Sequence, residues 1–379
     1  MRPIQMVDLR TQYEQIKTDI DRGIQAVIDS TSFVKGPAVE QFAHSLEAYT
    51  GARHVIPVGN GTDALQIALM ALGLKRGDEV ITPTFTFIAT AEVVALLGLT
   101  PVVVDVDWDT MNISVDAIRR AITPRTKAIV PVHLFGQCAD MEAIMQIAKE
   151  NNLYVVEDAC QAIGARYTFS DGRTLQAGTM GHIGCTSFFP SKNLGCYGDG
   201  GALFTNDDEL AAHIKAIANH GMVVRYHHDE VGVNSRLDSI QAAILSAKLP
   251  HLDEYTRTRQ SAAAYYDRAF ADNEHILIPS RAERSTHVFH QYTLRLQGVS
   301  RDAVREQLQS RSVPAMVYYP IPLHLQKAYQ DERYKQGDFP MAERLSECVL
   351  SLPMHTCLDE EQLKYITANV LEVIELCSR

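Results

Sequence analysis

A lysine, Lys192, stands in the stretch "TSFFPSKNLGCYGDGGALFTND", after aromatic residues and before a glycine-rich turn. An ammonium group in apolar surroundings is costly unless it is paired or used chemically. Glycine lets the backbone turn sharply or approach a ligand closely. The pattern therefore indicates a lysine that is presented to a bound molecule, with a surface lysine on a flexible turn as the alternative.

Other groups with chemical potential follow strand-like runs. "GNGTDALQ" follows "VIPV", and glycines that lead into a helix expose free N–H groups to an anion such as a phosphate. Thr62 adds a hydroxyl, although an ordinary turn capped by Thr62 or Asp63 is the alternative. Phe85 and Phe87 alternate in "TFTF", and one of them could stack on a flat ring instead of packing in the core.

"EDACQAIGA" places two acids at the end of the run "LYVV". Buried acids need partners, so one could cap the next helix while the other pairs with a cationic nitrogen of a ligand. Asp158 and Gln161 are three residues apart and could both reach one small molecule, with a plain N-cap as the alternative. Ser187 lies five residues before Lys192.

Together these groups match the needs of pyridoxal 5'-phosphate (PLP). The phosphate needs N–H and hydroxyl groups, and the ring needs a stacking face. The pyridine nitrogen needs a carboxylate, and the aldehyde needs a lysine with which to form a Schiff base. Each signal is weak by itself, and the combination predicts a PLP enzyme.

The elements that must position these groups form an alternation of strands and helices. Strand-like runs are predicted at 54–59, 79–86, 101–106, 127–135, 153–159, 185–190 and 201–206. Helical patterns lie between many of them, at 62–74, 88–99, 114–122 and 140–151. This alternation is typical of an α/β fold with a mainly parallel sheet covered on both faces, in which ligands bind at the carboxyl ends of the strands.

The character of the chain changes near residue 250. A helix is predicted from Ser235, because Ser235 and Asp238 have the spacing of a capping box, and Pro250 ends it. A long polar helix and mixed strands and helices follow. We expect a large domain over residues 1–250, a smaller C-terminal domain over 251–379, and a helical N-terminal segment that packs against either.

Composition argues against several classes of function. The 379 residues carry a formal net charge of −11 without a block of Lys and Arg, which disfavours nucleic acid or an anionic membrane as a partner. The seven cysteines form no CxxC pair, which favours a reducing compartment over a disulfide framework or structural zinc. Because the chain shows neither a signal-peptide core nor a membrane-length apolar run, we expect a cytoplasmic protein.

Six ordered blocks resemble the DegT-type sugar aminotransferases, which are PLP enzymes of the aspartate aminotransferase fold, fold type I. The blocks are "GNGTDALQIAL", "PTFTFIATAEVV", "VEDACQAIGA", "TSFFPSKNLGCYGDGGALFTND", "VGVNSRLDSIQAA" and "YYPIPLH". The similarity runs from "GPAVEQF" at residue 36 to "SLPMH" at residue 351. It implies a mainly parallel seven-stranded sheet covered by helices, with a smaller C-terminal α+β domain.

The resemblance also implies roles for the residues that contact the cofactor ring. Lys192 would form the Schiff base and act in catalysis. Asp158 would pair with the pyridine nitrogen, Gln161 would hydrogen-bond the ring oxygen, and Phe87 would stack on the ring.

The phosphate-binding residues implied by the resemblance come from two chains. Gly61, Thr62 and Ser187 would bind the phosphate within one chain. Asn234 would reach it from the other subunit, so that the enzyme would be a homodimer with shared active sites.

The blocks "TSFFPSKNLGCYGDGGA" and "RYHHDEVGVNSRLD" are most similar to enzymes that aminate UDP-2-acetamido-2-deoxy-3-oxo-glucuronate. Glutamate would be the amino donor, and the product would serve surface polysaccharide or lipopolysaccharide synthesis. Arg236 would grip a carboxylate of the sugar or the donor, as arginine forks do well. In "YYPIPL" Tyr318 replaces a substrate-binding histidine of the relatives, whereas Tyr319 is kept. The loop "YTFSDGRTLQAGTMGH" is long for the family.

Two other functions share this fold. A PLP-dependent sugar dehydratase would replace the lysine by histidine, and Lys192 is present. A non-catalytic regulatory protein need not keep the lysine, the acid and the phosphate cradle together. His227 and His228 are adjacent and lack a third ligand at helical spacing, so no metal site is predicted, and both would border the substrate or the dimer interface.

Overall fold

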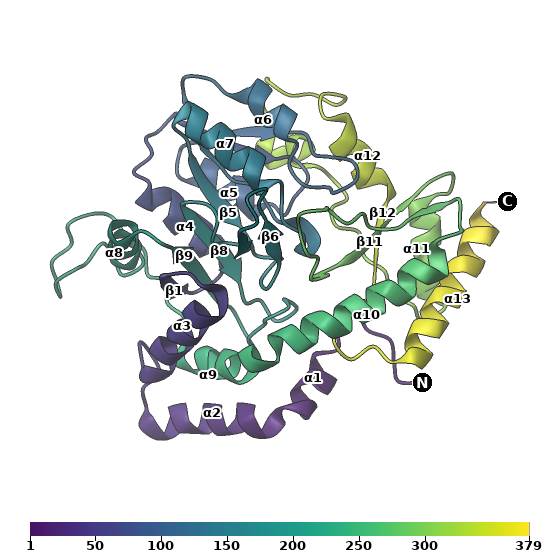
Figure 1. Cartoon of the computed structure of the whole chain (residues 1–379), viewed down its shortest axis with the longest axis horizontal. Coiled ribbons are helices and arrows are strands. Elements are labelled where there is room, and N and C mark those ends of the chain that lie inside the picture. Colours follow the sequence, from purple (N-terminus) through teal and green to yellow (C-terminus); the bar gives the residue numbers. More distant parts are fainter. Residues whose placement is uncertain (379) are drawn as a thin grey trace.

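A seven-stranded sheet forms the centre of the larger part of the molecule in the computed structural model, which describes residues 1–378 (Figure 1). In spatial order its strands are β1 (His54–Val58), β9 (Gly201–Thr205), β8 (Ile183–Ser187), β5 (Tyr154–Asp158), β4 (Thr126–Ile129), β2 (Glu79–Pro83) and β3 (Thr100–Val104). β9 is antiparallel to both neighbours, and the other six strands point their carboxyl ends the same way. The predicted mainly parallel seven-stranded sheet is confirmed.

Alternating side chains of these strands build a separate core on each face of the sheet. Val80 and Val156 pack on one face, and their neighbours Ile81 and Val155 pack on the other. The first face is covered by α4 (Gly61–Ala71), α5 (Ala89–Leu96) and α8 (Asp208–Ile217). The second is covered by α6 (Val115–Ala121) and α7 (Met141–Asn151). Burial on both faces explains why the strands read as continuous apolar runs.

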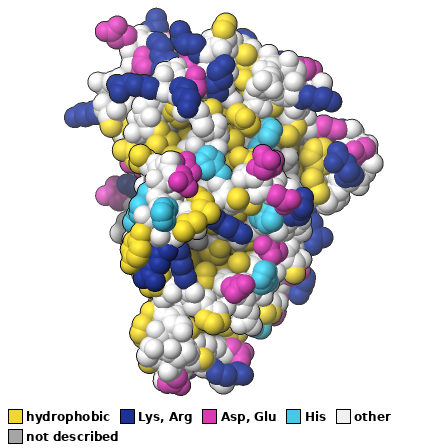
Figure 2. Space-filling model, turned by 90° about the vertical axis from the view of Figure 1, so that its left-hand side faces the viewer, with side chains coloured by type: hydrophobic (Ala, Val, Ile, Leu, Met, Phe, Trp, Pro, Cys, Tyr) yellow, Lys and Arg dark blue, Asp and Glu magenta, His cyan; other side chains and the backbone are white. Residues whose placement is uncertain are grey.

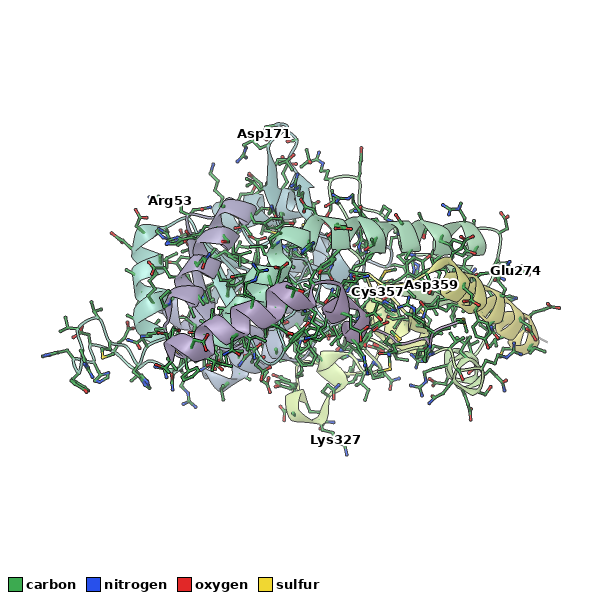
Figure 3. The ribbon with its side chains drawn as sticks, turned by 90° about the horizontal axis from the view of Figure 1, so that it is seen from below. Arg53, Asp171, Glu274, Lys327, Cys357 and Asp359 are labelled. Atoms are coloured by element: carbon green, nitrogen blue, oxygen red, sulfur yellow. The ribbon has the colours of Figure 1, made fainter. Side chains whose placement is uncertain are left out.

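The N-terminal segment contacts the large sheet through its third helix and the C-terminal part through residues that precede the first helix. Its helices are α1 (Leu9–Gln15), α2 (Lys17–Ser30) and α3 (Pro37–Thr50). Phe42 of α3 packs in a core with Val55 of β1. Arg2 donates to the Cys357 carbonyl at 2.7 Å and to Asp359 at 3.0 Å, two residues labelled in Figure 3. The segment therefore contacts both parts of the molecule.

The helix predicted from Ser235 begins later than expected. α9 spans Ser239–Lys248, and its N-cap residue Asp238 makes no side-chain capping bond. The Ser235 hydroxyl instead accepts from the Gly59 N–H at 2.9 Å and donates to Asp63 at 2.6 Å. The predicted capping box is wrong, because Ser235 ties its segment to the loop after β1.

The long helix α10 (Leu252–Phe270) connects the large sheet to a small antiparallel one (Figure 1). Leu252 packs in the core under the large sheet, whereas Phe270 packs in the core of the small sheet. The small sheet has the order β10 (Ile276–Leu277), β11 (Tyr292–Leu296) and β12 (Val349–Leu352). Its neighbours are α11 (Arg301–Ser310), α12 (Pro340–Cys348) and α13 (Glu360–Cys377). The division into residues 1–250 and 251–379 stays a prediction.

Short elements complete the fold. They are a hairpin of β6 (Arg166–Thr168) and β7 (Thr174–Gln176), and the 3-10 turns η1 (Leu134–Gly136), η2 (Leu249–His251), η3 (Leu323–Leu325) and η4 (Lys327–Tyr329). The hairpin occupies the loop that the sequence marked as long. None of the helices within residues 1–378 has the length and apolarity that crossing a membrane requires.

Candidate active site

Lys192 lies in the loop between β8 and β9, at the carboxyl edge of the large sheet. Its backbone N–H donates to the Phe189 carbonyl at 2.8 Å, which holds the loop in a tight turn. Burial lowers the pKa of the Lys192 ammonium, and the neighbouring Cys160 and Asp158 oppose that shift. Within residues 1–378 the ammonium donates no hydrogen bond that would explain its position. A half-buried amine without a hydrogen-bond partner is a group available to a ligand.

The start of α4 forms a cradle beside β8. Asn60 caps the helix by accepting from the Asp63 N–H at 2.8 Å, so the cap is neither Thr62 nor Asp63. In the described chain the N–H groups of Gly61 and Thr62 have no hydrogen-bond acceptor. A Cβ atom at Gly61 would lie 2.8 Å from the Ser187 Cβ, so that only glycine fits against this strand end. Free N–H groups at a helix N-terminus suit a phosphate.

The two acids at the end of β5 have different surroundings. Asp158 accepts from the Thr90 hydroxyl at 2.8 Å and from the Cys160 N–H at 3.2 Å. Glu157 is fully buried and accepts from His133 at 2.8 Å. It also accepts from backbone N–H groups in the loop before β8, at Gly178, Met180 and Gly181. Asp158 is therefore the acid on the side of Lys192, and Glu157 anchors a loop on the opposite face.

Gln161, Tyr319 and Phe87 are brought together near Asp158. The Gln161 amide oxygen accepts from the Phe135 N–H at 2.8 Å, and its NH₂ group donates to the Tyr319 hydroxyl at 3.0 Å. Burial raises the pKa of Tyr319. The Phe87 ring centroid lies 6.2 Å from that of Tyr319, and 54% of Phe87 is exposed. Phe85, by contrast, is buried in the core.

The structure adds His290 to the neighbourhood of Lys192. His290 is buried, and its Nδ1 atom has no hydrogen-bond partner among the residues described. Burial, together with the charges of Lys192 and Arg259, keeps the pKa of His290 well below its usual value. The sequence offered little signal for this residue, because "HVFHQY" reads as the start of an ordinary strand far from Lys192 in the chain.

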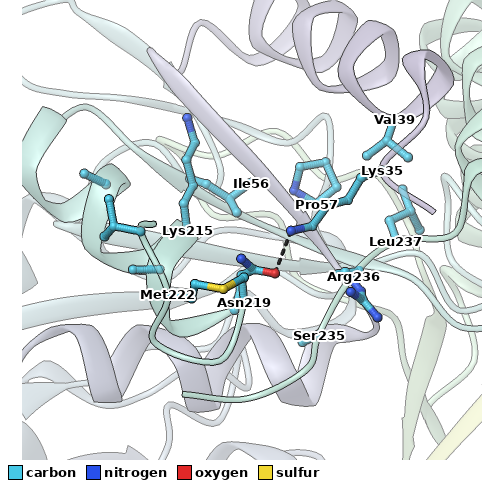
Figure 4. A pocket seen from close by; sticks show the side chains of 14 residues that line it. Lys35, Val39, Ile56, Pro57, Lys215, Asn219, Met222, Ser235, Arg236 and Leu237 are labelled. Atoms are coloured by element: carbon cyan, nitrogen blue, oxygen red, sulfur yellow. Dashed lines mark hydrogen bonds between the residues drawn. The ribbon is translucent and has the colours of Figure 1, made fainter. Parts of the chain in front are cut away.

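Asn234 and Arg236 flank Ser235, which ties their segment to the loop before α4. Arg236 lines a cavity of about 480 Å³ together with Lys35, whose ammonium donates to Asn219 at 2.6 Å (Figure 4). Neither Lys192 nor Asp158 lines this cavity. The Ser235 N–H donates to the Ala218 carbonyl at 3.1 Å, so it is not free to bind an anion.

His227 and His228 lie in an exposed loop. The Nδ1 atom of His228 donates to the His220 carbonyl at 2.9 Å. No group of three or more His, Cys, Asp or Glu side chains within residues 1–378 is arranged to hold a metal ion.

Known proteins resemble this chain along nearly its whole length. A relative in Pseudomonas aeruginosa, UDP-2-acetamido-2-deoxy-3-oxo-D-glucuronate aminotransferase, is 48% identical over 96% of this chain and 99% of its own. A "pleiotropic regulatory protein" of Geobacillus stearothermophilus is 47% identical over 97% of this chain and 98% of its own. The solved structure of Streptomyces venezuelae DesV with a ketimine intermediate has a TM-score of 0.94 at 40% identity and covers 99% of both chains.

The fold and the polar groups beside Lys192 define the class of protein, which is a PLP-dependent aminotransferase. The free amine, the cradle that only a glycine fits and the acid on the same side are the groups that PLP requires. The profile of the DegT/DnrJ/EryC1/StrS aminotransferase family matches residues 14–371. The chain belongs to this family.

Proposed function

We propose that the enzyme aminates the keto-sugar of UDP-2-acetamido-2-deoxy-3-oxo-glucuronate, with glutamate as the donor. The observation that carries the reaction class is the half-buried amine of Lys192, which has no hydrogen-bond partner and lies beside Asp158 and the α4 cradle. The sugar rests on the 48% identity to the Pseudomonas aeruginosa enzyme. We further propose a cytoplasmic role in making sugars for surface polysaccharide or lipopolysaccharide.

In this proposal the α4 cradle, Ser187 and Asp158 hold the phosphate and the pyridine nitrogen of PLP. PLP, when bound, supplies an aldehyde and an electron-withdrawing ring. The N–H groups of Gly61 and Thr62 and the Ser187 hydroxyl bind its phosphate. The Asp158 carboxylate would accept a hydrogen bond from the protonated pyridine nitrogen and favour that charge.

The ring and the reacting carbon are served by a second set of side chains. Phe87 would lie against the ring, and the remaining N–H of the Gln161 amide would donate to the ring oxygen. The Lys192 amine accepts the proton from the α-carbon of glutamate, and burial lowers the pKa of its ammonium, which favours the neutral form that acts as a base. With the keto-sugar, Lys192 returns a proton to the sugar carbon that receives the amino group.

Substrate recognition is assigned to Arg236, Tyr318 and Tyr319. Arg236 would pair with a carboxylate through two parallel hydrogen bonds. Tyr319 is oriented by Gln161, which places substrate and cofactor contacts on one network.

The substrate proposal is tested with two UDP-linked 3-keto-sugars, one with the C6 carboxylate and one with a C6 hydroxymethyl group. We expect glutamate-dependent amination of the acid to be favoured in kcat/KM. Arg236→Gln should remove most of that preference if Arg236 binds the sugar. Equal kcat/KM for the two sugars in the native enzyme would contradict the glucuronate proposal, and no turnover with any keto-sugar would favour a regulatory protein.

We also propose a homodimer in which Asn234 and Arg236 complete the site of the second chain. Two observations support it: Arg236 lines a cavity that Lys192 of its own chain does not line, and apolar side chains gather on the face that carries α8 and the following loop (Figure 2). Exposed residues of that loop are Val223, Val224, Tyr226 and Val231. An apolar patch of this kind is typical of an interface.

A mixing experiment tests the shared site. A Lys192→Ala chain is co-expressed with an Asn234→Ala,Arg236→Ala chain, after each homodimer has been shown to be inactive. If sites are shared, each mixed dimer has one intact site and regains up to about half of the native activity. If Asn234 and Arg236 serve their own chain, every site carries a defect and no activity returns.

A further inference from the structure

Side chains of α9 contact the backbone of the loop that carries Lys192, on the side away from the site. Lys248 at the end of α9 is 1% exposed, and its ammonium donates to the Gly195 carbonyl at 2.7 Å. The ammonium also lies 4.3 Å from the centroid of the Tyr197 ring, a favourable cation–π contact. No carboxylate pairs with Lys248 in the part of the chain that the structure describes.

Gln241 of α9 makes a second hydrogen bond to the backbone of the same loop. It lies seven residues before Lys248, two helical turns away, and so shares a face of α9 with it. Its side-chain oxygen accepts from the Tyr197 N–H at 2.8 Å. A Cβ atom at Gly198 would lie 2.9 Å from the Gln241 amide nitrogen, so glycine is needed for this close approach. The glycines after Lys192 thus allow a helix to hold the backbone directly.

The Gly195 carbonyl, which accepts from Lys248, belongs to the same tight turn as Lys192. A Cβ atom at Gly195 would lie 2.3 Å from the Pro190 carbonyl oxygen. On one side of Lys192 its own N–H donates to the Phe189 carbonyl at 2.8 Å. On the other side Asn193 donates to the Val288 carbonyl at 2.9 Å, two residues before His290. A shift of Gly195 therefore shifts the backbone that bears Lys192.

Stability does not account for a lysine at this position. The ammonium is withdrawn from water, and burial lowers its pKa to about 8. One hydrogen bond and one ring contact offset only part of the desolvation free energy of the ammonium. An apolar residue of similar size would stabilise the core more. Cys196 and Tyr197 are the titratable groups that face it from the loop.

We propose that Lys248 is a positioning residue, whose bond to the Gly195 carbonyl fixes the Lys192 amine relative to Asp158. The inference rests on the proposed function in taking Lys192 as the reacting amine. It assigns Lys248 no contact with substrate or cofactor. The position of the Lys192 amine would then depend on the buried ammonium of Lys248, on the far side of the loop.

The test compares Lys248→Met with Lys248→Arg and with Leu308→Ala, a core truncation in α11 that is remote from the loop. In cofactor-free protein, hydrogen exchange is followed at the Cys196 and Tyr197 amides, and acetylation of Lys192 is measured by peptide mapping against the exposed Lys327. We expect Lys248→Met to speed exchange at both amides at least about tenfold. It should change the relative acetylation rate of Lys192 and lower kcat about tenfold to a hundredfold. Lys248→Arg should retain most of each property.

Several outcomes separate this inference from the proposed function. If Lys248→Met resembles Leu308→Ala in exchange, acetylation and kcat, the positioning role is wrong. If Lys248→Met does not fold, Lys248→Gln replaces it and must show the same changes to a smaller degree, and unchanged acetylation in it would also overturn the inference. Failure of wild-type protein to attach PLP at Lys192 would reject the proposed function, whereas the cofactor-free measurements would still decide on Lys248.

Discussion

Two polar regions lie on opposite faces of the carboxyl end of β5, and they differ in how their groups are satisfied. The closed region contains Glu157, His133 and the N–H groups of residues 178–181. The open region contains Asp158, Lys192, Phe87 and the N–H groups at the start of α4. Both regions grow from one dipeptide, because consecutive strand residues point to opposite faces.

Every acceptor and donor of the closed region has a partner. Glu157 takes bonds from three backbone N–H groups and from His133, whose other nitrogen accepts from the Ala139 N–H at 3.1 Å. In the open region the Lys192 amine has no partner and half of the Phe87 ring is uncovered. A satisfied network stabilises the fold, whereas the unpaired groups on the other side of this sheet edge are free to bond to a ligand.

The largest effect is expected from removing the amine of the open region. Lys192→Ala should lose essentially all turnover, because no other described lysine is placed beside Asp158 to move the proton. The folded state should be kept, because the ammonium makes no hydrogen bond. Borohydride reduction of the holoenzyme followed by peptide mapping checks the assignment, and a label on another lysine would contradict it.

A large effect is also expected at the acid of the open region. Asp158→Asn keeps the size of the side chain and an acceptor for Thr90, but it lacks the charge that favours a protonated pyridine nitrogen. We expect kcat to fall by about 10²-fold or more with a modest loss of bound cofactor. Near-native kcat in this variant would show that Asp158 serves as a structural acceptor.

The matched substitution in the closed region, Glu157→Gln, should lower stability and leave kcat nearly unchanged. Glu157→Gln leaves an NH₂ group facing N–H donors, so that buried donors lose their acceptor. We expect the free energy of unfolding to fall by about 3 kcal/mol, measured by urea denaturation, with kcat per folded molecule nearly unchanged. The comparison of the two regions fails if Glu157→Gln reduces kcat as much as Asp158→Asn does.

The sequence predicted the large sheet and most of the open region because local patterns determine them. Apolar runs of strand length identified all seven strands, and they placed Asp158 at the end of one strand and Lys192 after the end of its neighbour. Positions that depend on tertiary contacts were not predictable. The start of α9 was misplaced because the Ser235 hydroxyl bonds to Gly59 and Asp63, which are remote in sequence.

The distinction between Glu157 and Asp158 shows the same limit. The sequence presents two equal acids, and only the loop at residues 178–181, which folds back onto one of them, tells them apart. Thr90 and His290 escaped prediction for a related reason. Their sequence neighbours indicate an ordinary helix and an ordinary strand. Only the fold brings Thr90 to Asp158 and His290 to the neighbourhood of Lys192.

The smallest effect is expected at the ring that the open region leaves uncovered. Phe87 and Phe85 belong to the same "TFTF" motif, yet Phe87 is 54% exposed and Phe85 is 1% exposed. Phe87→Ala should weaken PLP retention by about fivefold, because stacking of aromatic rings contributes about 1 kcal/mol. Its effect on the unfolding of cofactor-free protein should stay within about 0.5 kcal/mol, as for other exposed positions.

Phe85→Ala is the matched control for that prediction. It removes a buried ring of the core and should lower the free energy of unfolding by about 3 kcal/mol. Dialysis of the holoenzyme followed by cofactor absorbance measures retention, and urea denaturation of the cofactor-free proteins measures stability. Equal destabilisation by the two substitutions, with full PLP retention in Phe87→Ala, would place Phe87 in the core rather than against the ring and would remove it from the open region.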